Sequence, residues 1–212
     1  MKKSIADSEK GSSFRLDNRV NNLFEQYIEI LHSWNQRTRL TGYRDVDDIR
    51  RHLVQEALLA GVYFGLESSS FPIIDFGSGN GTPGVVFAIL NPSLPVYLVE
   101  RKQKKLSFLS YISSRLSLDN IILMNHLSDA LEDLDFSALP NVDVWMKAIS
   151  VDSLKEALLV SKNCLRHFRI KKFGEIESHP DCQMIRKHVI TSDICSLYPR
   201  FSITVSEALL SA

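Results

Sequence analysis

Residues 72–90, PIIDFGSGNGTPGVVFAIL, constrain the fold of this chain more than any other stretch. A short apolar run ends at Asp75, glycines follow at positions 77, 79, 81 and 84, and an apolar segment of helical length comes next. The order strand, glycine turn, helix brings the main chain of an α/β protein close to a nucleotide-like ligand, because glycine accepts a positive φ and has no Cβ. The sequence therefore predicts an α/β fold with a ligand at this turn.

Strand and helix patterns alternate around the turn and beyond it. The predicted strands are 72–76, 96–99, 121–125, 142–146 and 169–173, and the predicted helices are 84–90, 102–116, 151–164 and 180–188. Residues 194–198 and 201–205 flank a Pro-Arg pair and predict a closing antiparallel pair. Alternating βα units imply a mostly parallel sheet covered on both faces, with ligands at the carboxyl ends of the strands.

Two helical patterns precede the turn, at about 15–34 and 46–63, with a polar connection between them. We therefore expect residues 1–66 to form a helical extension packed on a core of residues 67–212, the two making one structural unit. Neither a signal peptide nor a bilayer-spanning run is recognisable, and the three cysteines lack metal-ligand spacing. We expect a cytoplasmic protein without a metal site.

Acidic residues that follow successive strands indicate the chemical class of the ligand. Residues 79–84 match the dinucleotide fingerprint Gly-x-Gly-x-x-Gly, so an NAD-dependent oxidoreductase and a purely structural turn both stay open as alternatives. The lysine of the P-loop motif is missing, which argues against ATP or GTP binding by that motif. Asp75 could hold an amine or a water, and Glu100 could accept hydrogen bonds from ribose hydroxyls. Ser128 and Asp129 follow the third strand, where the edge of an adenine would lie. Taken together, these positions favour a ligand that contains a nucleoside.

The sequence DFGSGNGTPGVVFAI resembles the first motif of S-adenosylmethionine-dependent methyltransferases. More narrowly, it resembles the bacterial 16S rRNA (guanine-N7) methyltransferase G family, also called GidB, whose pattern is Asp-x-Gly-Ser-Gly-x-Gly-Phe-Pro-Gly. The resemblance extends over about residues 20–205 and includes Trp34-Asn35, Leu40-Thr41, Arg44-Asp45, His52 and the charged run 100–105.

This resemblance implies a Rossmann-like class I methyltransferase fold with a mostly parallel seven-stranded sheet, S-adenosyl-L-methionine as cofactor, and methylation of N7 of a guanine in 16S ribosomal RNA. Guanine N7 carries an unprotonated lone pair near neutral pH, so no general base is needed, and His52 and Lys147 are candidates for positioning only. The implied cofactor-binding residues are Asp75, Gly77, Gly79, Gly81, Thr82, Glu100, Ser128, Asp129 and Lys147.

An RNA substrate requires basic side chains for its phosphates. Net charge is zero, so such binding would depend on local groups of basic residues, each of which could equally be a solvated face. The expected partner is ribosomal RNA or the small ribosomal subunit, with no membrane and with the protein as a monomer. The RNA-binding candidates are Arg37, Arg39, Arg44, Arg51, Lys104, Lys105, Lys171 and Arg200.

Several positions depart from the family pattern. Thr82 replaces an aromatic residue or leucine, and Lys147 replaces an arginine, keeping its charge without its planar fork. The family's His-x-x-Asp-Ser-Leu becomes residues 52–57, HLVQEA, which loses an acid. These changes support an alternative hypothesis, in which the chain binds S-adenosylmethionine but acts as a catalytically altered or inactive regulator or scaffold.

Overall fold

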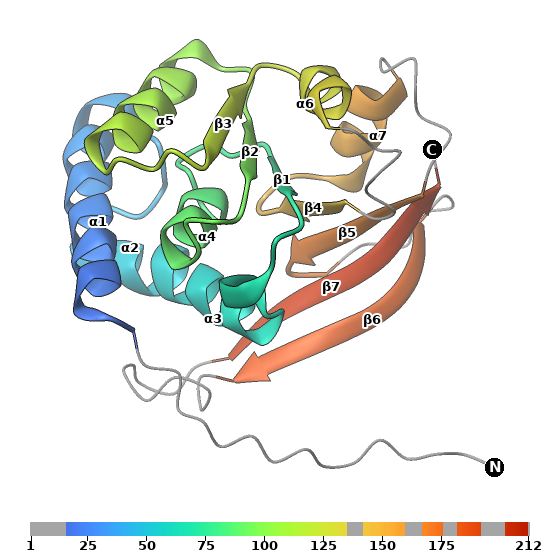
Figure 1. Cartoon of the computed structure of the whole chain (residues 1–212), viewed down its shortest axis with the longest axis horizontal. Helices are drawn as coiled ribbons and strands as arrows, with labels where there is room; N and C mark the ends of the chain where they lie inside the picture. Colours follow the sequence, from blue (N-terminus) through green and yellow to red (C-terminus); the bar gives the residue numbers. More distant parts are fainter. Residues whose placement is uncertain (1–15, 135–141, 160–166, 176–181, 192–201, 212) are drawn as a thin grey trace.

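In the described part of the chain, the sheet has seven strands in the order β3-β2-β1-β4-β5-β7-β6 (Figure 1). The computed structural model describes residues 16–134, 142–159, 167–175, 182–191 and 202–211. Strands β1 to β5 are parallel, and β7 runs antiparallel to both β5 and β6. This sheet confirms the predicted fold class. The strands are β1 (Ile73–Phe76), β2 (Val96–Val99), β3 (Ile121–Met124), β4 (Asp143–Met146), β5 (His167–Phe173), β6 (Cys182–Thr191) and β7 (Ser202–Ser211).

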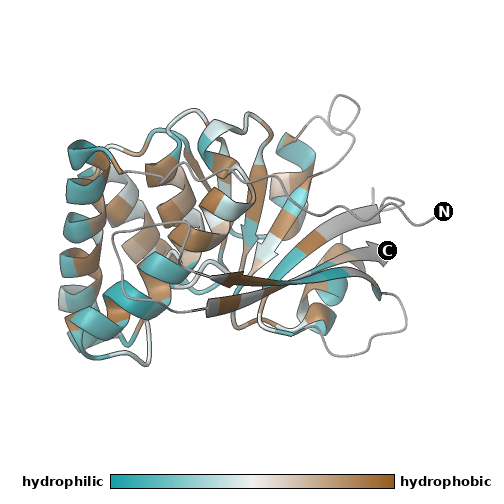
Figure 2. Ribbon diagram, turned by 90° about the horizontal axis from the view of Figure 1, so that it is seen from below, coloured by the Kyte–Doolittle hydropathy of each residue, from teal (hydrophilic) through white to brown (hydrophobic). Residues whose placement is uncertain are grey.

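Helices cover both faces of the sheet and enclose two buried clusters. Because strand side chains alternate, Ile73 of β1 joins the cluster under α4 and α5, whereas Ile74 joins the cluster under α6 and α7. Figure 2 shows the resulting contrast between a hydrophobic interior and hydrophilic outer helix faces. The helices are α4 (Gly84–Leu90), α5 (Gln103–Arg115), α6 (Leu127–Asp133) and α7 (Val151–Leu159).

The helices before β1 pack on the same side as α4 and α5. Helix α1 (Asn18–Thr38) is capped by Asp17 and buries a stripe of side chains at helical spacing, Phe24, Tyr27, Ile28 and Leu31. A second helical segment is continuous through α2 (Val46–Ile49), the π-helical turn η1 (Arg50–Gln55) and α3 (Glu56–Tyr63), and the short η2 (Leu66–Ser68) leads to β1. None of the described helices is both long and apolar enough to cross a membrane.

Two secondary-structure predictions fail for local reasons. The segment 180–188 is predicted as a helix, but its described part, residues 182–188, belongs to β6. There His188 and Ile190 are buried and Lys187 and Val189 are exposed, an alternation typical of a strand. Helix α6 is absent from the sequence-based prediction, because its seven residues carry only three apolar side chains, whereas the equally short α4 is a continuous apolar run after the glycine turn. The predicted strand 194–198 lies outside the described residues.

Candidate functional site

The turn between β1 and α4 is tied to the end of β2. The N–H groups of Gly77 and Ser78 both donate to the carbonyl of Val99, at 2.9 and 3.1 Å, and the Ser78 hydroxyl donates to the carbonyl of Asp75 at 2.8 Å. Gly77 and Gly79 have φ values of +77° and +57°, which L side chains rarely adopt. The predicted glycine turn is therefore a compact, hydrogen-bonded loop at the carboxyl edge of the sheet.

The four glycines of this turn face different surroundings. A Cβ on Gly81 would lie 2.6 Å from Val85 Cγ2, and one on Gly84 would lie 2.2 Å from Leu98 Cδ2, so both residues allow close packing of the interior. A Cβ on Gly79 would meet only the end of the Lys105 side chain, at 3.4 Å, and the carbonyl of Gly77. Gly79 thus offers bare main chain to a ligand, whereas Gly81 faces α1 and α5.

Asp75 lies beneath the turn rather than on it. Its side chain is 1% exposed, Oδ2 accepts a hydrogen bond from the N–H of Gly84 at 3.0 Å, and Oδ1 has no hydrogen-bond partner among the described residues. Burial raises the pKa of Asp75 to about 7, against the opposing effect of the Gly84 N–H. A ligand above the turn would meet Asp75 through its charge, not through contact.

Glu100, at the end of β2, borders the turn. Oε2 accepts from the N–H of Gly79 at 3.1 Å and Oε1 accepts from the N–H of Lys102 at 2.8 Å, while Lys105 Nζ lies 3.8 Å from Oε2. An ionised carboxylate has about four lone-pair sites, so each oxygen keeps capacity for a further donor. Glu100 is therefore positioned where hydroxyl groups of a ligand at Gly79 could reach it.

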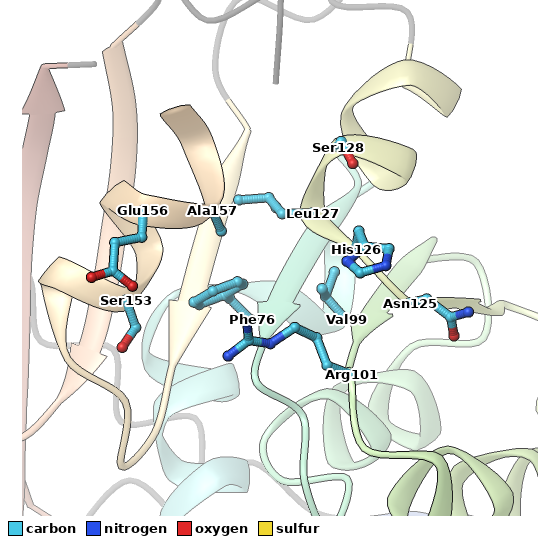
Figure 3. Close-up of a pocket in the computed structure, with 10 residues that line it drawn as sticks. All are labelled: Phe76, Val99, Arg101, Asn125, His126, Leu127, Ser128, Ser153, Glu156 and Ala157. Atoms are coloured by element: carbon cyan, nitrogen blue, oxygen red, sulfur yellow. The ribbon is translucent and has the colours of Figure 1, made fainter. Parts of the chain in front are cut away.

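A cavity of about 260 Å³ lies at the carboxyl ends of the first three strands. Figure 3 shows its two walls, one from α7 and the other from the β3–α6 connection, with Phe76 between them. Ligand pockets in proteins start at roughly 300 Å³, so this cavity suits one part of a nucleoside-sized ligand. The lining residues are Phe76, Val99, Arg101, Asn125, His126, Leu127, Ser128, Ser153, Glu156 and Ala157.

Ser128 and Asp129, the polar pair that follows β3, have different roles. Ser128 lines the cavity, as expected of a residue beside an adenine. Asp129 instead caps α6, because its Oδ2 accepts from the N–H of His126 at 3.2 Å, and its Oδ1 accepts from the Ser128 hydroxyl at 3.2 Å. The Asp129 carboxylate orients Ser128 while it satisfies the start of the helix.

Ile149 covers the turn next to this cavity. A Cβ on Gly77 would lie 2.5 Å from Ile149 Cδ1, so the half-buried isoleucine rests directly on the glycine. The preceding Ala148 has φ +59°, a left-handed conformation that is uncommon outside glycine. The site fits the nucleoside end of a ligand, with a cavity, bare main chain at Gly79 and the Glu100 carboxylate. A ligand extending over Gly77 has to displace the Ile149 side chain.

Lys147 joins the end of β4 to the helical extension. Its Nζ donates to Glu56 Oε2 at 2.9 Å and to the carbonyl of His52, and Glu56 Oε1 lies 3.0 Å from His52 Nδ1. Burial lowers the pKa of Lys147, and the Glu56 and Asp75 charges oppose that shift. The acid missing from the family's pattern thus has a counterpart in Glu56, which contacts both positioning candidates. Its spacing of four residues from His52 is the only sequence signal for it.

Thr82 and Tyr27 attach α1 to the turn. The Tyr27 hydroxyl donates to the carbonyl of Asn80 at 2.8 Å and lies 3.0 Å from Thr82 Oγ1. Thr82 is 4% exposed, so its side chain faces α1 and not the cavity. The sequence does not indicate Tyr27 as a site residue, because only the fold brings α1 to the turn.

The basic candidates are divided between the surface and the interior. Arg37, Arg39, Arg44, Arg51 and Lys104 are exposed, and Lys105 lies beside Glu100. The prediction that Lys171 binds RNA is wrong for this structure, because its side chain is buried, 5% exposed, and forms an ion pair with Asp143. Arg200 lies outside the described residues.

Comparison with known proteins identifies a matching family. The model of the GidB family, described as rRNA small subunit methyltransferase G, matches residues 20–161. The ribosomal RNA small subunit methyltransferase G of Streptococcus thermophilus (strain CNRZ 1066) is 28% identical over 112 residues, which are 53% of this chain and 47% of that protein. The protein of the same name from Hydrogenovibrio crunogenus is 34% identical over 104 residues, 49% of this chain and 46% of that protein. The chain therefore spans about half the length of these curated relatives.

Among solved structures, a crystal structure of a MtNAS mutant in complex with S-adenosylmethionine has a TM-score of 0.52 and 9% sequence identity, and the match covers 92% of this chain and 75% of that chain. At this identity the likeness concerns the fold alone.

Proposed function

We propose that this chain, which belongs to the rRNA small subunit methyltransferase G family by its match over residues 20–161, transfers a methyl group from S-adenosylmethionine to N7 of a guanine in 16S ribosomal RNA. The observation that carries the proposal is the joint position of Gly79, Glu100 and the cavity at the carboxyl ends of β1, β2 and β3. Ligands of open α/β sheets bind at this edge. The proposal places the protein in the cytoplasm as a monomer.

The binding site would take the cofactor in two parts. The cavity beside Phe76 and Ser128 would hold the adenine, and Glu100 would accept from the ribose hydroxyls. The methionine end would lie over Gly79 and Gly77, and at Gly77 it would replace the side chain of Ile149. The cationic end of the ligand would lie near two carboxyl side chains, the buried Asp75 and Glu100, and a positive charge there would favour the ionised form of Asp75, whose pKa burial raises to about 7.

The bound cofactor supplies an electrophilic methyl group, and the remaining work belongs to the chain. No side chain has to remove a proton, because guanine N7 already presents a free lone pair. The protein has to hold N7 in line with the methyl carbon and exclude water, a contribution that can reach about 7–11 kcal/mol. Lys147, fixed by Glu56 and by the carbonyl of His52, is the positioning residue at the end of β4.

The test combines ligand binding with methyl transfer. Isothermal calorimetry should show binding of S-adenosylmethionine and S-adenosylhomocysteine and none of NAD; NAD binding alone would favour an oxidoreductase. Radiolabelled methyl groups should appear in 16S RNA or small subunits taken from cells that lack this protein. Cofactor binding without transfer to either substrate would replace the enzyme by the regulator or scaffold hypothesis. Loss of both binding and transfer would refute the proposal.

A further inference from the structure

Two aromatic rings, those of Tyr43 and His52, form a stacked pair next to the ion pair of Lys147 and Glu56. The rings of Tyr43 and His52 lie with centroids 4.9 Å apart and an interplanar angle of 14°. Tyr43 is 37% exposed, so part of its ring is open to solvent, while His52 is half-buried. Burial and the charges of Glu56 and Asp48 raise the pKa of Tyr43 above its usual value, which keeps the phenol neutral at physiological pH.

The loop that carries Tyr43 is held in one conformation by a buried amide. Asn35, 8% exposed near the end of α1, donates from Nδ2 to the carbonyl of Tyr43 at 2.7 Å and accepts at Oδ1 from the N–H of Thr41 at 2.8 Å. The N–H of Tyr43 donates in turn to Thr41 Oγ1 at 3.3 Å. The ring is thus presented on a fixed main chain, which lowers the entropic cost of a stacking partner.

Two arginines lie on the same loop. Arg39 and Arg44 line an open hollow of about 770 Å³. Within the part of the chain that the structure describes, neither guanidinium forms an ion pair or a hydrogen bond. On the other side of the ring pair, His52 contacts Glu56, which binds Lys147 at the end of β4. Tyr43 is thus the chain neighbour of Gly42 and Arg44, which line the hollow, and its ring stacks on His52, which is linked through Glu56 to Lys147.

We propose that Tyr43, backed by His52, stacks on an unpaired base of the RNA substrate, and that Arg39 and Arg44 hold the adjoining phosphates. This inference rests on the proposed function and adds the residue that orients the RNA. Single-stranded RNA is recognised by stacking of splayed bases on aromatic side chains, with basic residues along the backbone. An exposed neutral ring on the same loop as two arginines that have no partner among the described residues offers both elements, whereas a protein partner would need a larger apolar surface.

The experiment compares Tyr43→Leu and Tyr43→Phe with the matched control Phe71→Leu, which removes an exposed aromatic ring, 58% accessible, two residues before β1. Filter binding measures the affinity for unmodified 16S RNA, calorimetry measures the affinity for S-adenosylmethionine, and methyl transfer gives kcat and KM. Tyr43→Leu should weaken RNA binding and raise the RNA KM roughly 5- to 100-fold, the range expected for one stacked base. Tyr43→Phe keeps an aromatic ring and should have the parent's RNA affinity and KM, as should Phe71→Leu.

Each outcome separates this inference from the proposed function. If the parent transfers methyl groups and Tyr43→Leu keeps the parent's RNA affinity and KM, stacking by Tyr43 is refuted while the enzyme stands. If Tyr43→Leu loses affinity for S-adenosylmethionine to the same degree, the ring supports the fold or the cofactor site, and the inference also fails. If the parent binds neither cofactor nor RNA, the proposed function itself is refuted. Replacement of Arg39 and Arg44 by Gln should reduce the salt dependence of RNA binding; an unchanged salt slope would contradict the phosphate contacts.

Discussion

Replacement of Asp75 by Asn should change how the stability of this protein depends on pH. Burial raises the pKa of Asp75 in the folded state to about 7, from an ordinary value of 3.8. An acid of this kind prefers its protonated form in the fold. Its contribution to stability is therefore fully present below about pH 4 and is lost as the pH rises towards 7.

The size of the effect follows from the two pKa values. Each unit corresponds to about 1.4 kcal/mol, so the full difference is at most about 4 kcal/mol, of which somewhat more than half falls between pH 5 and 7. Asparagine cannot titrate, and its side-chain oxygen can still accept from the N–H of Gly84. Its amide N–H would occupy the place of the unpartnered Oδ1, at a cost of about 1–3 kcal/mol that does not vary with pH.

Urea unfolding followed by circular dichroism at pH 5, 6, 7 and 8 gives the free energy of unfolding of parent and variant. The difference between Asp75→Asn and the parent should shift in favour of the variant by about 2–3 kcal/mol from pH 5 to pH 7 and then level off. Asp119→Asn, which changes an exposed carboxylate, is the control and should show a flat difference. A flat difference for Asp75→Asn as well would mean that this carboxyl is solvated or paired, and the reasoning about its burial would be refuted.

Three further predictions test the site, at Gly79, at the Lys147–Glu56 pair and at Ile149. Gly79→Val should abolish binding of S-adenosylmethionine in calorimetry while the protein remains folded. Gly65→Val, at φ +70° with open space around it, controls for the strain of a positive φ. Unchanged binding in Gly79→Val would place the pocket elsewhere. Lys147→Ala should lower the rate of methyl transfer by about ten-fold or more, because a positioning contact is lost, and should change the melting temperature much less. Glu56→Gln should reproduce part of that loss. Equal rates in Lys147→Ala and the parent would remove Lys147 from the site. Ile149→Ala should strengthen cofactor binding several-fold because it uncovers Gly77, and weaker binding would show that the isoleucine is part of the pocket.

The sequence predicted the part of this fold that depends on neighbouring residues. The turn after β1 is encoded by glycines at fixed spacing, and its position and the helix that follows were predicted correctly. Strand β6 was mistaken for a helix because polar residues such as Lys187 and His188 obscure the alternation, and its pairing with β7 depends on a distant segment. Local pattern is a weak guide where tertiary pairing decides the conformation.

The site was only partly predictable for the same reason. Glu56 and Lys147 are 91 positions apart, and no local pattern joins them. The sequence predicts Lys171 as an exposed RNA-binding side chain, but β5 turns it inward, where Asp143 compensates its charge and the ring of Phe64 lies 4.4 Å from Nζ. A sequence shows which residues are charged, whereas the fold decides which of those charges face solvent.

Helix α1 holds both halves of the proposed site from one rigid element. Tyr27 is bonded to the glycine turn, and Asn35, eight positions further on, holds the loop of Tyr43. Eight residues of α-helix span about 12 Å, and a helix of this kind does not stretch. If a ligand displaced the glycine turn, α1 would move with it, and the loop of Tyr43, which Asn35 holds at the other end of the helix, would shift as well. By reciprocity, whatever binds at that ring would exert the same influence on the turn.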